Sequence, residues 1–191
     1  MVTEPLQTRA ATSSGGRPIA QAVPTVLLES LQHHLNLELT ASSNYWALAI
    51  WFAERELRGF SHYFRHESDQ ERSHAGLIAD YLIARGQPVS LSEIEAPRQQ
   101  WSSIEEVFAA VFQQEVDVTT SLQQIYGLAE QSGDVRSTVF LDPLIAQQIA
   151  AENEVAHLLG RVKLGGGDGA ALLILDAELA AGATSPAKLA S

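Results

Sequence analysis

The sequence predicts an all-α protein in which four long helices form a bundle and a short fifth helix follows. Four long stretches carry apolar residues at helical spacing, and no stretch alternates in the manner of a strand. A third observation is a repeated gap, because Glu38 lies 33 residues before Glu71 and Glu115 lies 33 residues before Gln148. The gap indicates a degenerate repeat of two helix pairs, with one polar group per helix at a matched height.

The first helix pair is expected over residues 25–53 and 60–85. Pro24 suits the first turn of a helix, and Gly59 follows a charged segment and is interpreted as the link between the two helices. Residues 85–88 read Arg-Gly-Gln-Pro and end the second helix, because glycine favours the position after the C-cap and proline cannot continue the helix.

A long connection is expected between the two pairs. Residues 87–101 contain two prolines and show no helical pattern. A connection of this length in a four-helix bundle usually crosses the whole length of the bundle.

The second helix pair is expected to begin at Ser102-Ser103, where a serine cap precedes acidic residues in the first turn. Its two helices meet at a turn over residues 132–134, and the second runs to about Leu164. Pro143 predicts a kink or a local cap near the start of that helix. Three consecutive glycines then precede the short fifth helix, expected over about 168–181.

These elements divide the chain into one domain and two tails. Residues 1–24 are predicted to be a flexible N-terminal tail, residues 25–182 a single helical domain, and residues 183–191 a C-terminal tail. A chain of 191 residues is long enough for one domain with a sizeable core.

Composition limits the classes of partner. A net charge of −11 argues against nucleic acid and against an anionic membrane surface, and it suits a protein that attracts cations. The absence of cysteine excludes disulfides, thiolate zinc sites and iron–sulfur clusters. There is neither a membrane-spanning apolar run nor a secretory signal pattern, so we expect a cytoplasmic protein.

The polar groups of the repeat predict a metal site. Glu71 and His74 are three residues apart and therefore lie on one face of their helix. Neither belongs in a core without a partner, and a divalent metal would pair with both. With Glu38, Glu115 and Gln148, the set is rich in oxygen and suits Fe(II), Mn(II) or Mg(II) better than structural zinc. Two metals sharing a carboxylate would also relieve the repulsion between three buried glutamates.

Several segments together resemble the ferritin family, and within it the non-haem ferritins of prokaryotic and cyanobacterial type. The matching segments are residues 35–42, Glu71-Arg-Ser-His-Ala75, residues 112–115 and Phe140-Leu-Asp-Pro143. The similarity covers about residues 26–181, including the long crossover and the fifth helix. Glutamates from two helices and Glu-x-x-His motifs from the other two are an established pattern of ferritin-like di-iron proteins.

The resemblance implies a function and assigns ligands. It implies an iron-storage ferritin that oxidises Fe(II) with O2 at a ferroxidase centre of two irons per subunit and stores ferric oxide in a homo-oligomeric cage of twenty-four chains. Glu38, Glu71 and His74 would hold the first iron, with Glu71 bridging. Glu71, Glu115 and Gln148 would hold the second.

Three further residues take roles within this resemblance, and a plainer alternative stays open for Tyr45 and Glu67. Tyr45 would stand by the di-iron centre and donate an electron or a hydrogen bond; otherwise it is a core tyrosine with a satisfied hydroxyl. Glu67 would relay iron inward, or it is a solvated glutamate. Asp142 would form an acidic ring where three subunits meet and admit cations there.

Departures from the family pattern narrow the expectation. Gln148 and Ala151 replace the second Glu-x-x-His of the haem-containing members, and Arg72 stands where their haem-ligating methionine would be, so we expect no haem. The positions of a third iron site found in many prokaryotic ferritins carry no carboxylate, so we expect that site to be absent or very weak. Those positions are Gln70, Gln147, Ala150 and Ala151.

Other polar residues are expected to lie outside the centre. A second Glu-x-x-His, Glu154 to His157, lies six residues beyond the repeat and is interpreted as surface or interface polarity. The remaining histidines are expected to be exposed or interfacial; they are His33, His34, His62 and His66. Two rival functions stay open: a di-iron oxygenase or rubrerythrin-type peroxidase in a small oligomer, and a passive shell with a degraded site.

Overall fold

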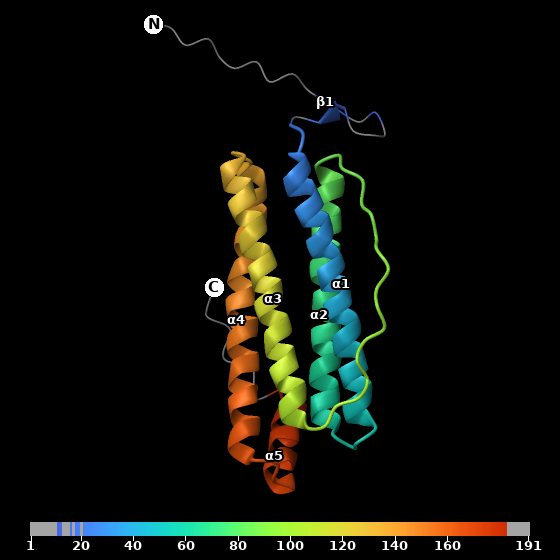
Figure 1. Ribbon diagram of the computed structural model, residues 1–191, viewed down its shortest axis with the longest axis vertical. Helices are drawn as coiled ribbons and strands as arrows, with labels where there is room; N and C mark the ends of the chain where they lie inside the picture. Colours follow the sequence, from blue (N-terminus) through green and yellow to red (C-terminus); the bar gives the residue numbers. More distant parts are fainter. Residues whose placement is uncertain (1–10, 13–15, 17, 20, 183–191) are drawn as a thin grey trace, which may run out of the picture.

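The computed structural model describes residues 11–12, 16, 18–19 and 21–182, and it confirms the all-α fold. Four long helices lie side by side as two antiparallel pairs, and a short fifth helix packs at one end (Figure 1). The helices are α1 Thr25–Ala53, α2 Arg58–Ala84, α3 Ile104–Gln131, α4 Val135–Gly165 and α5 Gly169–Ala180.

Two strands of two residues precede the bundle, which the sequence did not predict. β1 Ala11–Thr12 pairs antiparallel with β2 Pro18–Ile19. Ile19 and Val23 are buried, so apolar side chains of this segment pack against the domain. Residues 1–10, 13–15, 17, 20 and 183–191, where most of the flexible tails were predicted, lie outside the described residues.

The start of α2 corrects the prediction that Gly59 is a linker. The helix begins at Arg58, and the connection from α1 is the short segment that contains Glu56, whose φ is 60°. Gly59 lies in the first turn of α2, where a Cβ would come within 1.8 Å of the carbonyl oxygen of Asp176 in α5. Glycine is therefore required at this position by the close approach of α5.

The end of α2 and the crossover agree with the prediction. Gly86 has a φ of 71° and donates to Ile83, and Gln87 donates to Leu82, which is the pattern of a Schellman cap. The crossover then runs along the length of the bundle to the start of α3 (Figure 1). Hydrogen bonds join its Ser90 carbonyl and Ser92 amide to Gln32 and Asn36 of α1.

Helix α3 begins at the predicted serine cap, and α4 runs through its proline. The hydroxyl of Ser103 accepts a hydrogen bond from the Glu106 amide at 3.0 Å. Pro143 lies inside α4, which is continuous from Val135 to Gly165, so the alternative of a local cap at Pro143 is wrong. The actual cap of α4 is Asp134, whose carboxylate accepts from the Ser137 amide.

Asp134 also anchors α2 to the turn between α3 and α4. Arg85, at the end of α2, donates to both carboxylate oxygens of Asp134 at 3.0 and 2.7 Å, and both side chains are buried. Burial alone would raise the pKa of Asp134, but hydrogen bonds from Arg85 and Ser137 outweigh it and lower that pKa. Removing one partner of such a buried pair leaves an uncompensated charge and costs about 3–5 kcal/mol.

The core consists of two apolar clusters with a polar layer between them. One cluster, towards α5, contains stacked aromatic rings of Tyr45, Phe52, Phe60 and Phe64. The other, towards the opposite end of the bundle, is mainly aliphatic and includes Leu27, Leu31, Leu35, Ile78, Leu82, Leu122 and Ile125. The buried polar side chains Glu38, Glu71, Glu115 and Gln148 occur between the two clusters along their helices.

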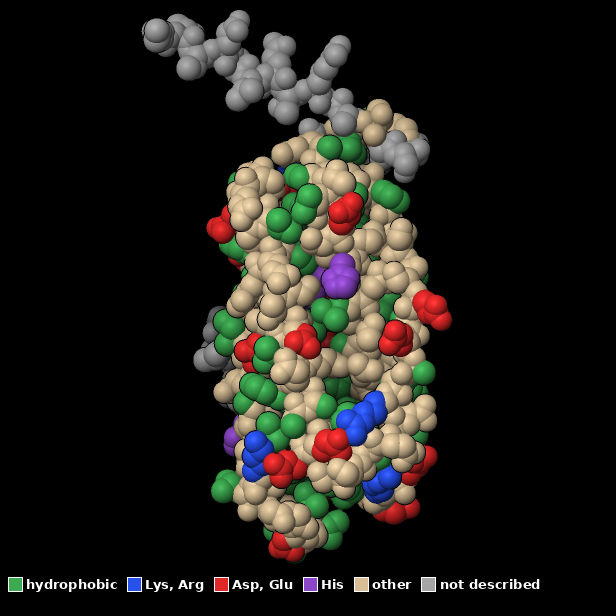
Figure 2. Space-filling model, viewed as in Figure 1, with side chains coloured by type: hydrophobic (Ala, Val, Ile, Leu, Met, Phe, Trp, Pro, Cys, Tyr) green, Lys and Arg blue, Asp and Glu red, His purple; other side chains and the backbone are tan. Residues whose placement is uncertain are grey.

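The surface carries charges of both signs. On the face shown in Figure 2, most Lys and Arg side chains gather in the lower half, with Asp and Glu beside them. Arg98 and Glu106 form an ion pair at the start of α3. Among the described residues, no helix has the length and apolar character needed to cross a membrane.

Candidate metal centre

Each long helix places one side chain of the predicted repeat in the polar layer. Glu38 comes from α1, Glu71 from α2, Glu115 from α3 and Gln148 from α4, and all four are at most 5% exposed. The 33-residue gaps thus reflect matched heights along the paired helices, because Gln148 contacts Glu115 directly.

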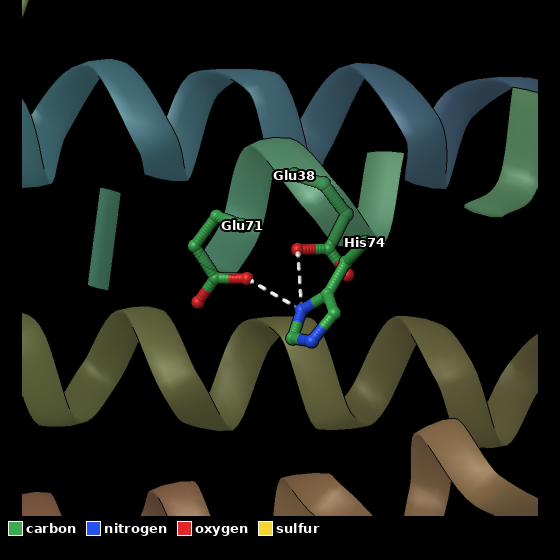
Figure 3. A group of neighbouring side chains, drawn as sticks. All are labelled: Glu38, Glu71 and His74. Atoms are coloured by element: carbon green, nitrogen blue, oxygen red, sulfur yellow. Dashed lines mark hydrogen bonds and ion pairs between the residues drawn. The ribbon is translucent and has the colours of Figure 1, made fainter. Parts of the chain in front are cut away.

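Three of the predicted ligands converge on one point. Ligand atoms of Glu38, Glu71 and His74 all lie within 4.8 Å of one another. Nδ1 of His74 is 2.9 Å from Oε2 of Glu71 and 3.9 Å from Oε2 of Glu38, so the imidazole points between the two carboxylates (Figure 3). His74 is the most exposed of the three, at 22%, and it borders a cavity.

Glu115, Gln148 and Tyr45 form a second group beside the first. Nε2 of Gln148 donates to Oε2 of Glu115 at 2.7 Å. The hydroxyl of Tyr45 donates to the other carboxylate oxygen, Oε1. Tyr45 is fully buried against Phe64, so its ring is held in the aromatic cluster while its hydroxyl contacts the polar layer.

Burial makes the negative charge of this layer costly in the absence of a cation. Burial raises the pKa of Glu71 to about 7, and the hydrogen bond with His74 partly offsets this rise. Burial likewise raises the pKa of Glu38 and of Glu115. The hydrogen bond with Glu71 raises the pKa of His74. Protons and other cations therefore compete for the carboxylates of this layer.

The donor set fits a hard or borderline divalent metal ion. Among the described residues, Oε2 of Glu38 is a buried oxygen without a hydrogen-bond partner, on the side of the carboxylate that faces His74. An unpaired buried carboxylate oxygen is expensive, and a metal ion would satisfy it. Three carboxylates, one amide oxygen and one imidazole suit iron or manganese.

His34 corrects the expectation that it is exposed or interfacial. It is fully buried, one turn before Glu38 on α1, with Nε2 3.0 Å from Oε1 of Glu38. Its Nδ1 lies 2.9 Å from the hydroxyl of Ser121 in α3. Burial lowers the pKa of His34 to about 4, so the ring is neutral at physiological pH. The spacing of four residues from Glu38 is the signal that could have identified it.

A cavity of about 720 Å³ opens beside His74 and contains Glu67, which was predicted to relay iron. Glu67 is 16% exposed, and burial together with Glu154 raises its pKa to about 8. Glu154, interpreted from the sequence as surface or interface polarity, also lines this cavity and is half-buried. His62 and His66 line it as well, and His66 is 61% exposed.

The four positions at which a third metal site was not expected border the same cavity; they are Gln70, Gln147, Ala150 and Ala151. Asp142 lies away from the centre, on the exposed surface of α4. Its carboxylate raises the pKa of Tyr126 on α3, so the two side chains are neighbours.

Comparison with known proteins finds relatives over most of the chain. Residues 28–165 match the model of the ferritin family, described as a ferritin-like domain. The chain is 30% identical to the bacterial non-haem ferritin of Staphylococcus saprophyticus over 155 residues, covering 81% of this chain and 93% of the relative. It is 25% identical to that of Escherichia coli O6:H1, over 80% of this chain and 93% of the relative.

Solved structures give the same result. An open-pore ferritin from the hyperthermophilic archaeon Archaeoglobus fulgidus superposes with a TM-score of 0.81 at 30% identity, covering 84% of this chain and 98% of that one. A closed form of that ferritin, engineered by site-directed mutagenesis, gives a TM-score of 0.80 at 31% identity, over 83% and 97% of the two chains. The fold, the polar layer and these matches together show that the chain belongs to the ferritin family.

Proposed function

We propose that this protein is an iron-storage ferritin whose bundle contains a ferroxidase centre for two iron ions. Membership of the ferritin family supports iron storage as the general function. The observation that carries the ferroxidase proposal is the convergence of Glu38, Glu71 and His74, next to Glu115, between the two apolar clusters of the core. Three buried carboxylates that repel one another would destabilise a core that bound no cation.

The substrate iron ions would occupy two unequal positions. Glu38, Glu71 and His74 would hold the first Fe(II), and Glu71, Glu115 and Gln148 the second, with Glu71 shared. Two Fe(II) ions supply one electron each, so one O2 and two protons give two Fe(III) and one H2O2. The protein fixes the geometry and lowers the charge repulsion between the metals. We expect no haem, because Arg72 stands where the haem-containing members of the family carry their ligating methionine.

Tyr45 and the cavity would serve this reaction. The hydroxyl of Tyr45 already donates to Glu115, so it would orient the ligand of the second iron. Glu67 lies on the cavity wall between solvent and the centre and would pass Fe(II) inward. Asp142 is exposed on α4 and would attract cations at a junction between subunits.

A cage would then hold the oxidised iron as a mineral. We propose a homo-oligomer of twenty-four chains in the cytoplasm, with α5 at a junction between subunits. Leu164 is 90% exposed, and Leu173 and Ile174 of α5 are 62% and 59% exposed, so this end of the chain offers an apolar surface for other copies.

Aerobic Fe(II) oxidation by the Glu71→Ala variant tests the ferroxidase proposal. Because Glu71 would contact both irons, its loss should slow the fast phase of oxidation by at least about a hundredfold. Glu29→Ala is the matched control, since Glu29 lies exposed on α1, away from the polar layer. Oxidation at the native rate in Glu71→Ala would show that the centre lies elsewhere.

A further inference from the structure

His34 is a buried polar side chain that the proposed ligand set does not use. It lies on the core-facing side of α1, one turn from Glu38, and is 0% exposed. An imidazole is costly at this depth unless its two nitrogens find partners. Both nitrogens face polar groups, Ser121 of α3 on one side and Glu38 on the other.

The partners fix the tautomer of the ring. A Glu38 that holds a metal ion is ionised and can only accept, so Nε2, which lies 3.0 Å from Oε1, then carries the proton. Nδ1 is then an acceptor, and the hydroxyl of Ser121 donates to it at 2.9 Å. Nε2 lies 3.0 Å from Oε1 but has no hydrogen-bond partner of acceptable geometry among the described residues, so the ring or the carboxylate must turn for the bond to form.

This arrangement distinguishes the two oxygens of Glu38. Oε1 lies against His34, whereas Oε2 faces His74 and has no hydrogen-bond partner among the described residues. A carboxylate held through one oxygen offers the other at a fixed position and angle. Side chains that hold a ligand in this way commonly change metal affinity by about 10–100-fold when they are removed.

We propose that His34, held by Ser121, is a positioning residue that occupies Oε1 of Glu38 and presents Oε2 as a single-oxygen ligand to the first metal ion. The inference rests on the proposed function, since it takes Glu38 as a ligand of that metal. It also explains why a histidine occupies the stripe of α1 that otherwise carries Leu27, Leu31 and Leu35. A leucine at this position would remove the donor that faces Oε1 of Glu38.

The test compares four variants of the assembled, metal-free protein. His34→Leu removes the donor, His34→Gln restores one on a side chain of similar reach, and Ser121→Ala removes the far support. His33→Leu is the matched control, because His33 is the adjacent residue and is exposed. Two measurements are made: titration with Co(II), followed by its visible absorbance, and crystal structures without metal to locate the Glu38 carboxylate.

We expect His34→Leu to weaken the first Co(II) equivalent by about 10–100-fold and to turn the Glu38 carboxylate away from its native orientation. His34→Gln should recover most of the affinity and the native orientation, Ser121→Ala should lose affinity by a smaller factor, and His33→Leu should match the native protein. Native Co(II) affinity in folded His34→Leu would overturn the proposal. The proposal would also be overturned if folded His34→Gln bound Co(II) as weakly as His34→Leu, because restoring a donor would then have no effect.

The design separates this inference from the proposed function. If His34→Leu does not assemble, Ser121→Ala is the deciding variant. Native Co(II) affinity together with a native orientation of the Glu38 carboxylate in Ser121→Ala would contradict the inference. Glu71→Ala is titrated in parallel: if it binds Co(II) like the native protein, the proposed centre is wrong. In that case the metal-free crystal structures still report whether His34 orients Glu38.

Discussion

The centre holds its three buried glutamates close to the point at which protons and metal ions compete for them. The pKa of Glu71 lies at about 7 because burial penalises its charge, and those of Glu38 and Glu115 are also raised. A metal ion must displace the protons that these carboxyls retain, so binding should weaken as the pH falls below 7. Because the pKa of Glu71 is raised on folding, its ionisation destabilises the metal-free protein.

Glu71→Gln should therefore stabilise the metal-free protein at high pH. The pKa of Glu71 is raised on folding from 4.5 to about 7, so its contribution to stability is fully present below pH 4.5 and is lost as the pH rises through 7. Glutamine cannot ionise, so we expect the variant to exceed the native protein in free energy of unfolding by about 2 kcal/mol at pH 8. Denaturant unfolding in a chelator at pH 5 and pH 8 measures this.

The gain should shrink towards pH 5, and the control Glu29→Gln, on exposed surface, should show no such trend. A Glu71→Gln variant that is less stable than the native protein at pH 8 would contradict the electrostatic account. The variant should at the same time bind Co(II) more weakly, because an amide is a poorer ligand than a carboxylate.

Tyr45→Phe should affect the second metal position more than the first. The hydroxyl of Tyr45 donates to Glu115, and this hydrogen bond opposes the rise in the pKa of Glu115 that burial causes. Its removal costs about 1.5 kcal/mol, or roughly tenfold in affinity for the second Co(II) equivalent. The first equivalent should be unchanged in a stepwise titration, with Tyr126→Phe as the control. Equal weakening of both equivalents would show that Tyr45 acts on the whole bundle.

The sequence predicts the four side chains that the structure gathers in the polar layer, but it does not predict the side chains that contact them. Glu38, Glu71, Glu115 and Gln148 could be found because a repeated gap gives several weak signals one shared geometry. His34 could not be assigned in the same way, because a histidine beside another histidine on an amphipathic helix is equally consistent with exposure. The spacing of four residues places His34 on the side of α1 that carries Glu38, but its burial and its contact with Ser121 depend on how α3 packs against α1.

At the scale of the elements, α5 is held by a contact that requires the absence of a side chain. Gly59 allows the backbone of α5 to approach α2, and the amide of Phe60 donates to the carboxylate of Asp176 at 2.9 Å. Arg161 of α4 and Glu178 of α5 form an ion pair at the other side of the same helix. Both contacts depend on the placement that Gly59 permits.

Gly59→Ala should therefore displace α5. The added Cβ would meet the Asp176 carbonyl at 1.8 Å, so backbone must move, and we expect a loss of at least about 2 kcal/mol in the free energy of unfolding. Limited proteolysis should also cleave more rapidly in the turn before α5. Thermal unfolding and proteolysis of the assembled protein measure the two effects.

Gly76→Ala is the matched control, because a Cβ there has no heavy atom within 4 Å. Because alanine favours a helix more than glycine does, Gly76→Ala should raise the free energy of unfolding by about 0.5–1 kcal/mol. A native stability in Gly59→Ala would mean that α5 does not pack on α2 as described. The sequence predicted a linker at this position because a glycine after a charged segment resembles a turn, and a close approach between elements distant in sequence leaves no local pattern.

At the scale of the whole molecule, a polar layer separates an aromatic cluster from an aliphatic one. Both clusters bury large side chains almost completely, which stabilises the bundle on either side of the charged groups. The protein can thus carry an energetically costly site in the middle of its core. The all-α fold and the crossover were predictable because long amphipathic stretches and prolines are local signals.

Native mass spectrometry tests the proposed assembly. Twenty-four chains of 20.7 kDa give a species of roughly 500 kDa. The exposed apolar side chains of α5 would be covered in such a cage, so Leu173→Asp should reduce its yield while leaving the helical content unchanged. A dimer as the largest species of the native protein would exclude the cage and favour the rival reading as a small di-iron enzyme.

The polar layer is proposed to bind two iron ions, and anomalous diffraction at the iron edge detects such binding directly. Crystals soaked aerobically with Fe(II) should show two peaks, one among Glu38, Glu71 and His74 and one beside Glu71, Glu115 and Gln148. The second peak should have the lower occupancy, because Gln148 offers a neutral oxygen. Iron peaks confined to the vicinity of Gln70 and Gln147, with none in contact with Glu71, would contradict the claim.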